Sequence, residues 1–305
     1  MQPVRGILLK ISSVLVFIVM ASLIKYTSDT IPPGEAVFFR SLFAMPVILA
    51  WLAWRHELHA GLKTAQPMGH VWRGIVGTLA MGLGFGGLAF LPLPEVTAIG
   101  YAAPLLVVIF AAMFLGEEVR LFRISAVVVG MVGVLIVLSP RLSVGADISH
   151  AEALGVMLVL GGAVFAALAQ IFVRKLVATE STSAIVFYFS LTATLLSLVT
   201  LPFGWAMPSL TEAALLILAG LLGGVGQILL TSSYRHADAS VIAPFEYVSI
   251  LFALGIGYWV FSEVPTLTML GGAVLVVCAG IMIIWREHQL GIERARQRKA
   301  MTPQG

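Results

Sequence analysis

The sequence predicts an all-α integral membrane protein with ten transmembrane helices, arranged as two inverted five-helix repeats. Three observations predict this fold: the composition, a series of apolar stretches, and an internal repeat. Of the 305 residues, 59% are hydrophobic and only 11% are charged, and the mean hydropathy is +1.01. Soluble domains carry about 25% charged residues. The composition therefore excludes an ordinary soluble enzyme, a disordered protein and a nucleic-acid-binding protein.

The apolar stretches follow one another with mostly short connections. A helix needs roughly 20 apolar residues to cross the hydrocarbon core of a bilayer. Pro32 and Pro33 separate the first two stretches, and Pro92 and Pro94 separate the third from the fourth. A helix ends and restarts at such prolines. The predicted spans are residues 7–27, 34–54, 72–91, 94–115, 121–139, 153–173, 183–203, 211–233, 239–261 and 266–285.

The basic residues are distributed unevenly between the two sides of these spans. If the N-terminus is cytoplasmic, all of the 18 Lys and Arg residues except Lys25, Arg40 and Arg141 fall on the cytoplasmic side. Lys and Arg are enriched in the cytoplasmic loops of membrane proteins. We therefore expect both termini to be cytoplasmic and residues 287–305 to form a basic cytoplasmic tail.

The two halves of the chain, 6–139 and 153–286, resemble each other. Because each half has an odd number of predicted spans, the halves must have opposite orientations in the bilayer. Inverted repeats are common in secondary transporters, and the substrate site then lies near the midplane between the repeats. The matched residues are Gly6 and Gly155, Lys25 and Arg174, and Ser41 and Ser190, each 149 apart, and Tyr101 and Tyr247, 146 apart.

Several short motifs resemble those of the ten-helix EamA-type members of the drug/metabolite transporter superfamily. The resemblance implies a basket of ten helices, transport of small metabolites and a location in the bacterial inner membrane. Members of this family include amino-acid exporters. The motifs are Ala-Ser-Leu-Ile-Lys at 21–25, Phe-Phe-Arg-Ser-Leu at 38–42, Tyr-Ala-Ala-Pro-Leu at 101–105, Phe-Leu-Gly-Glu-Glu at 114–118, Ile-Ala-Pro-Phe-Glu-Tyr at 242–247 and Val-Phe-Ser-Glu at 260–263.

Three of the ionisable residues within the predicted spans are candidates for the substrate site, because charge inside a membrane is costly and indicates function. Glu246 follows Pro244 in the ninth span. In a functional role, its carboxylate binds a cationic group or carries a coupling proton. In a structural role, it is a buried acid paired with a residue of a neighbouring helix. Arg40 and Lys25 either bind a substrate carboxylate or reach the lipid headgroups. Pairing with Glu35 is a further structural alternative for these two cations.

Aromatic and amide side chains are further candidates for the substrate site. Tyr101 and Tyr247 occupy repeat-related positions, and Trp259 lies in the ninth span. Gln170 and Gln227 lie inside the sixth and eighth spans, where an unpaired amide is costly. Each of these side chains either contacts substrate or packs between helices.

Glycines four residues apart are expected to let helices approach closely. Gly82 and Gly86 form one such pair, and Gly220 and Gly224 form another. The Gly-x-Gly-x-x-Gly pattern at 82–87 lies in an apolar span with no preceding strand, which argues against a dinucleotide site. The sequence has no P-loop and no His-Glu-x-x-His motif, and Cys278 is its single cysteine. We therefore expect no cofactor, no metal site and no ATP hydrolysis.

These features favour a secondary transporter of small metabolites, most simply amino acids or related zwitterions, with export as the expected direction. In this hypothesis Glu246 meets an ammonium group or a coupling proton, and Arg40 or Lys25 meets a carboxylate. The expected partners are the small-molecule substrate and the lipid bilayer, with no nucleic acid. The alternatives are a lipid-carrier flippase and a channel-like facilitator. An intramembrane enzyme is less favoured because the histidines lie in or near connections.

Overall fold

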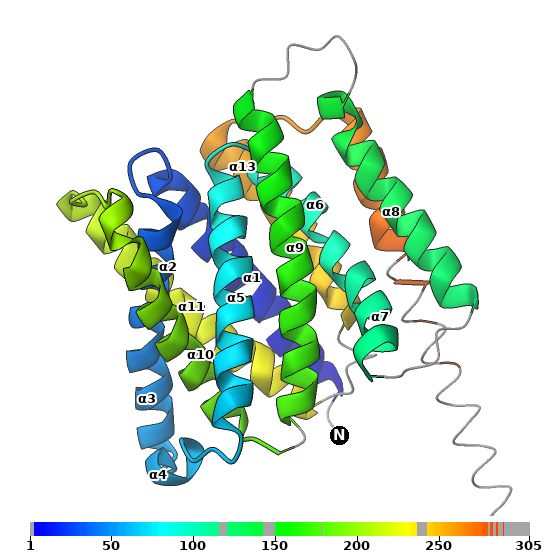
Figure 1. Ribbon diagram of the computed structural model, residues 1–305. Coiled ribbons are helices and arrows are strands. Elements are labelled where there is room, and N and C mark those ends of the chain that lie inside the picture. Colours follow the sequence, from blue (N-terminus) through cyan, green and yellow to red (C-terminus); the bar gives the residue numbers. More distant parts are fainter. Residues whose placement is uncertain are drawn as a thin grey trace, which may run out of the picture.

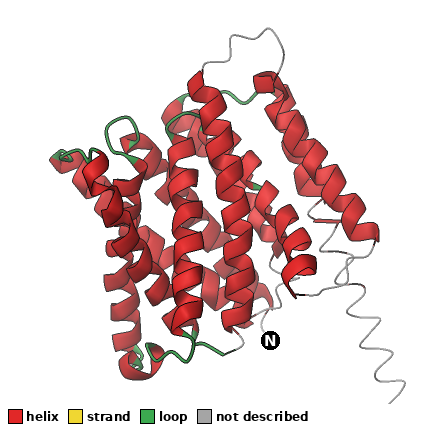
Figure 2. Cartoon of the chain, viewed as in Figure 1, coloured by secondary structure: helices red, strands yellow, loops and turns green. Residues whose placement is uncertain are grey.

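The computed structural model describes residues 3–115, 121–142, 150–177, 179–236 and 243–279, together with 281, 282, 285 and 289. Within these ranges the chain forms helices joined by turns and loops, and no strand is present (Figure 2). The elements are α1 (Pro3–Thr27), α2 (Pro33–Leu42), α3 (Ala44–Trp54), α4 (Leu58–Gly61), α5 (Pro67–Leu88), α6 (Leu93–Gly100), α7 (Ala102–Leu115), α8 (Leu121–Leu142), α9 (His150–Val177), α10 (Thr182–Ser197), η1 (Leu198–Phe203), α11 (Leu210–His236), η2 (Ala243–Val248) and α13 (Ser249–Phe261).

Within the described residues, six apolar helices are long enough to cross a membrane, as expected for a multi-pass membrane protein. The remaining predicted spans coincide with shorter apolar helices. The six long helices are Val4–Thr27, Pro33–Trp54, Pro67–Leu88, His150–Val173, Thr182–Phe203 and Leu210–Leu230. The shorter ones are Leu93–Val107, Val128–Val137, Ser249–Phe261 and Leu267–Ala279.

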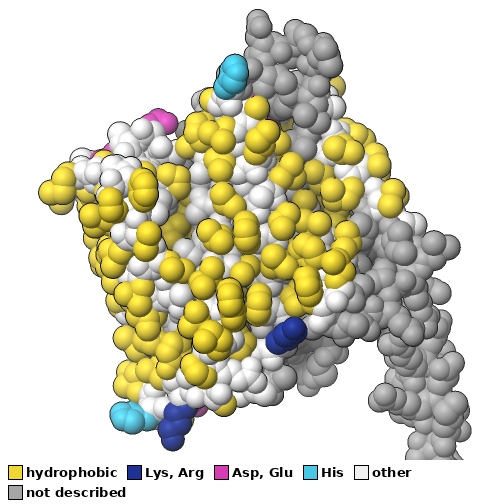
Figure 3. All heavy atoms as spheres, in the orientation of Figure 1, with side chains coloured by type: hydrophobic (Ala, Val, Ile, Leu, Met, Phe, Trp, Pro, Cys, Tyr) yellow, Lys and Arg dark blue, Asp and Glu magenta, His cyan; other side chains and the backbone are white. Residues whose placement is uncertain are grey.

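The helices form one bundle in which distant parts of the sequence lie side by side (Figure 1). Helix α1 packs along α11, and α5 packs along α9. Helices α2, α5 and α10 pack against one another. Hydrophobic side chains cover the wall of the bundle in Figure 3, and the visible charged side chains lie toward its two ends. An apolar wall with charged ends is the surface that a bilayer requires.

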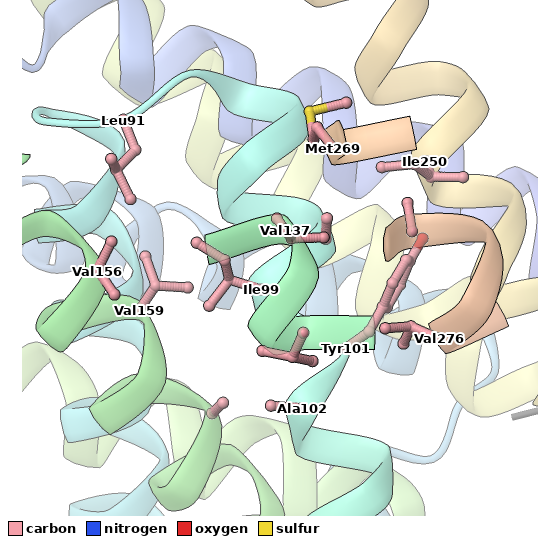
Figure 4. Packing of buried hydrophobic residues seen from close by; sticks show 14 of the residues in the cluster. Leu91, Ile99, Tyr101, Ala102, Val137, Val156, Val159, Ile250, Met269 and Val276 are labelled. Atoms are coloured by element: carbon pink, nitrogen blue, oxygen red, sulfur yellow. The ribbon is translucent and has the colours of Figure 1, made fainter. Parts of the chain in front are cut away.

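Two large clusters of buried apolar residues fill the bundle, and a smaller one joins α3 to α10. One cluster joins α1, α2, α5, α10, α11 and α13 around Val37, Phe85 and Phe189. The other joins α6, α7, α8, α9 and α13 with the helix Leu267–Ala279. Figure 4 shows this second cluster, with Tyr101 close to Ile250 and Val276. Each cluster takes residues from both halves of the chain, so the two repeats share their cores.

Proline explains why three of the predicted spans are not continuous α-helices. The span Pro33–Trp54 is divided into α2 and α3 at Phe43, and Pro46 follows in the first turn of α3. The fourth span is divided into α6 and α7 at Tyr101, three residues before Pro104. In the ninth span, η2 contains Pro244 and precedes α13 as a 3₁₀-helix. Proline has no N–H to donate to the preceding turn, and this weakens the helix.

The glycines of α11 confirm the expected close approach of helices. A Cβ atom at Gly220 would lie 2.8 Å from the carbonyl oxygen of Phe39, and one at Gly224 would lie 3.0 Å from that of Ala44. The same expectation is wrong for Gly82, where a Cβ atom would meet only a methyl carbon of Val37, at 4.0 Å. Spacing alone does not reveal which face of a helix meets a neighbouring backbone.

Candidate functional site

Lys25 joins three parts of the chain at one end of the bundle. Its ammonium group donates to the carbonyl oxygens of Leu91 at 2.8 Å and Leu88 at 3.3 Å, where α5 ends and α6 begins. It also forms an ion pair with Glu263 at 3.0 Å, just beyond α13. The second carboxylate oxygen of Glu263 accepts from the backbone N–H of Leu93 at 3.0 Å. An ammonium group has three donors, so these three acceptors match its capacity.

Tyr101 and Tyr247, the repeat-related tyrosines, are in direct contact. Their rings meet edge to face, with centroids 5.1 Å apart and planes at 70°. The Tyr101 hydroxyl donates to the carbonyl oxygen of Tyr247 at 3.3 Å and shares a short hydrogen bond with the Ser249 hydroxyl. All three side chains are buried. Ser249 is a partner that the sequence pattern did not reveal.

Arg40 is buried in α2 and has no acidic partner among the described residues. Only 3% of its surface is exposed, and its Nε and Nη1 atoms have no hydrogen-bond partner. Its guanidinium carbon lies 5.6 Å from the centroid of the Phe189 ring. The alternative of pairing with Glu35 is not realised, since the Glu35 carboxylate accepts from the backbone N–H of Ala206 at 3.1 Å.

Arg73 is a second interior arginine, and sequence reasoning missed it. Its guanidinium carbon lies 3.7 Å from the centroid of the same Phe189 ring. Its Nε and Nη1 atoms are also buried without a hydrogen-bond partner. The predicted third span begins at residue 72, which places Arg73 at the membrane edge. Helix α5 instead begins at Pro67, so Arg73 lies inside the span. Proline is favoured in the first turn of a helix, and Pro67 was therefore the sequence signal for this earlier start.

The other candidate residues are spread over the bundle. Gln170 on α9 is exposed, and Gln227 on α11 is half-buried. Trp259 is 85% exposed and lines an open pocket of about 410 Å³ with Tyr258, Ser262 and Val264. The backbone of Glu246 lies in η2, while its side chain lies outside the described residues. Within the described ranges, no group of three His, Cys, Asp or Glu side chains is placed to hold a metal ion.

Glu180 ties the two repeats together at the other end of α5. One carboxylate oxygen accepts from the Thr64 hydroxyl at 3.0 Å and from the N–H groups of Ala65 and Gln66, both at 2.8 Å. The other oxygen lies 3.4 Å from Nε2 of His70, an ion-pair distance without hydrogen-bond geometry. Burial raises the pKa of Glu180, but these hydrogen bonds outweigh burial and hold the pKa below its ordinary value of 4.5.

Comparison with known proteins places the chain among membrane transporters. The sequence profile of the EamA-like transporter family matches residues 4–139 and again residues 153–285. A profile described as Solute carrier family 35 matches residues 96–203. The pseudopaline exporter CntI of Pseudomonas aeruginosa is 34% identical over 281 residues, which cover 91% of this chain and 95% of the exporter.

Two further similarities extend this picture. The S-adenosylmethionine uptake transporter of Rickettsia bellii is 30% identical over 265 residues, or 87% of this chain and 88% of that protein. A solved crystal structure with 18% sequence identity has a TM-score of 0.67 and covers 93% of this chain and 98% of its own. At this identity the structural likeness concerns the fold alone.

Proposed function

The chain belongs to the EamA-like transporter family of the drug/metabolite transporter superfamily, and on this premise we propose that it is a secondary transporter. It moves a small metabolite across the bacterial inner membrane by alternating access. Ten spans form two inverted repeats, 6–139 and 153–286, and both termini are cytoplasmic. The six long and four shorter apolar helices, together with the two matches to one family profile, support this topology.

The contact between Tyr101 and Tyr247 carries the proposal. These residues are 146 apart and hold equivalent positions in the two halves, yet their rings touch. Arg40 and Phe189 are likewise 149 apart and lie against each other. Two equivalent positions related by a two-fold axis meet only close to that axis. In inverted-repeat transporters the substrate site lies at this junction, and discontinuous helices form it. Tyr101 and Tyr247 stand where the fourth and ninth spans are interrupted.

The substrate we propose is an amino acid or a related zwitterion. Arg40 binds its carboxylate, because the donors of Lys25 already have acceptors whereas buried nitrogens of Arg40 have none. Glu246 meets the ammonium group or a coupling proton. Tyr101, Tyr247 and Gln227 shape the pocket. The proposed direction is export, which agrees with the exporter from Pseudomonas aeruginosa, whereas the Rickettsia relative is named for uptake.

The test is flux in proteoliposomes that contain the purified protein, with a panel of radiolabelled amino acids and with or without a pH gradient. We expect saturable flux that the gradient drives and that Arg40→Gln and Glu246→Gln abolish while both variants still insert. Arg55→Gln is the matched control, because Arg55 is exposed and paired with Glu57. Flux that does not saturate would favour a channel-like facilitator. Translocation of a lipid carrier without amino-acid flux would favour a flippase.

A further inference from the structure

We propose that Arg40 and Arg73 together form a binding site for a doubly charged anionic group, with Phe189 as the surface that orients both guanidinium groups. The group is either a pair of carboxylates or one phosphoryl group. This inference rests on the proposed function, because it names the substrate class of the transporter. It also adds a residue, Arg73, whose position in the sequence suggested only a cytoplasmic charge.

The two arginines approach one aromatic ring from opposite ends of the bundle. Arg40 lies seven residues into α2, and Arg73 lies six residues into α5. The starts of these helices lie at opposite ends of the bundle in Figure 1. At 1.5 Å per residue, each Cα atom is roughly 10 Å inside the bundle. Both side chains then reach Phe189, with guanidinium carbons 5.6 and 3.7 Å from its ring centroid.

Two nitrogens of each guanidinium group lack an acceptor among the described residues. These are the Nε and Nη1 atoms of Arg40 and of Arg73, and all four atoms are buried. Three acids near the ends of the spans have other partners: Glu35 accepts from Ala206, Glu180 accepts from Thr64 and Glu263 pairs with Lys25. The two positive charges also repel each other. Buried charges in a membrane protein are normally paired, so two unpaired cations indicate a function.

Stacking on Phe189 does not satisfy these donors. A cation–π contact places the cation over the face of the aromatic ring, and the ring offers no lone pair to accept a hydrogen bond. The N–H groups point outward within the guanidinium plane and form a fork that fits a carboxylate or a phosphate. A single carboxylate fills one fork and leaves the other cation unpaired. Two acidic groups, or one phosphoryl group with several oxygens, fill both forks and remove the repulsion.

Two glycines, one on α5 itself and one on α11, leave room for this pair of side chains. A Cβ atom at Gly77 would lie 2.2 Å from Nη1 of Arg73, and one at Gly223 would lie 3.0 Å from Nε of Arg40. Larger residues at these two positions would therefore displace the guanidinium groups. Ser41 and Ser190 follow Arg40 and Phe189 in the sequence. Both are buried, and their hydroxyl oxygens have no hydrogen-bond partner within the described part of the chain.

Equilibrium binding to the purified protein in detergent tests the site. Isothermal titration compares glutarate with its monoamide, glutaramate, which differs by one negative charge, and with inorganic phosphate. We expect glutarate or phosphate to bind at least about tenfold more tightly than glutaramate, as charged hydrogen bonds predict. Arg73→Gln should bring the preferred ligand to the affinity of glutaramate, and Arg40→Gln should weaken all three ligands. Preference for glutarate identifies carboxylates, and preference for phosphate identifies a phosphoryl group.

Arg55→Gln is the matched control, because Arg55 also lies over an aromatic ring, that of Trp51 at 5.3 Å, but is exposed and paired with Glu57. It should leave all three affinities unchanged. Equal binding of all three ligands to the wild type, or an unchanged preference in Arg73→Gln, would overturn the proposal. If Arg73→Gln does not fold, the melting temperature of the wild-type protein with each ligand tests the proposal. Glutarate or phosphate must raise it more than glutaramate does.

This experiment separates the anion site from the proposed transport of zwitterions. If no amino acid moves in proteoliposomes but the preferred ligand depends on Arg73, the anion site stands and the zwitterion assignment fails. If amino acids move while Arg73→Gln keeps the preference of the wild type, the transporter assignment stands and the anion site fails. L-glutamate and L-glutamine provide the corresponding pair of transport substrates, since they too differ by one carboxylate.

Discussion

The interior cations of this protein differ in whether their donors find acceptors. Lys25 and Arg40 both follow apolar residues near the ends of neighbouring predicted spans, so the sequence predicts the same alternatives for both. Lys25 is held by two carbonyl oxygens and Glu263. Arg40 is more deeply buried and stacks on a ring without an acid. A cation with all its acceptors in place holds structure together, whereas one without them is available to a ligand.

We expect Lys25→Met to lower the thermal stability of the purified protein more than loss of an exposed ion pair does. The substitution leaves Glu263 and two carbonyl oxygens without their donor, at a cost of about 1–3 kcal/mol. Glu263→Gln should cost less, and the double variant should be less destabilised than the sum of the single variants. Arg55→Gln, which breaks the exposed pair with Glu57, should change the melting temperature little. Additive effects of Lys25→Met and Glu263→Gln would contradict the pairing.

At the scale of helices, small residues determine which pairs come close. Gly224 of α11 faces the α3 backbone, where a Cβ atom would lie 2.9 Å from Cβ of Val47 and 3.0 Å from the carbonyl oxygen of Ala44. A Cβ atom at Gly84 of α5 would meet no heavy atom within 4 Å. The same residue type therefore has a packing role at one helical position and none at the other.

Gly224→Ala should destabilise the protein, whereas Gly84→Ala should be neutral or stabilising. Alanine favours a helix over glycine by about 1 kcal/mol at either site, so the intrinsic term is the same in both variants. Only at Gly224 must a backbone move to accept the methyl group. The melting temperature and the monodisperse fraction in detergent give the readout. Equal behaviour of the two variants would show that α11 does not approach α3 as described.

Helix continuity marks the limit of what the sequence could predict. Hydropathy identifies the fourth and ninth spans, and an offset of 146 relates Tyr101 to Tyr247, whose rings are in contact. Pro244 indicates a weakened helix in the ninth span, because proline cannot donate to the preceding turn. Hydropathy gives no sign of the interruption at Tyr101, three residues before Pro104. The Glu263 partner of Lys25 was likewise missed, since it lies 238 residues away in the chain and only packing brings the two together.

At the scale of the whole molecule, the connection between the repeats through Glu180 should depend on pH. The pKa of this carboxyl is below 4.5 in the folded protein, so its stabilisation is present above the ordinary pKa and is lost as pH falls through the lowered value. Glu180→Gln should therefore lower the melting temperature at pH 7 and progressively less under acidic conditions. Glu57→Gln, at an exposed residue, should show no such convergence with the wild type. A difference between wild type and Glu180→Gln that stays constant across pH would contradict this role.

Glu180 and Glu263 bind the chain at opposite ends of α5, and this arrangement has a consequence for the proposed transport cycle. Glu180 accepts from the backbone N–H of Ala65 just before α5 begins, and Glu263 accepts from that of Leu93 after α5 ends. Both carboxylates come from the second half of the chain and both capture the first half. Because α5 has 22 residues, these two contacts lie about 33 Å apart along its axis. In the proposed alternating-access cycle, releasing one of these contacts only while the other stays closed would never open a continuous pathway, and the ion gradients of the cell would be preserved.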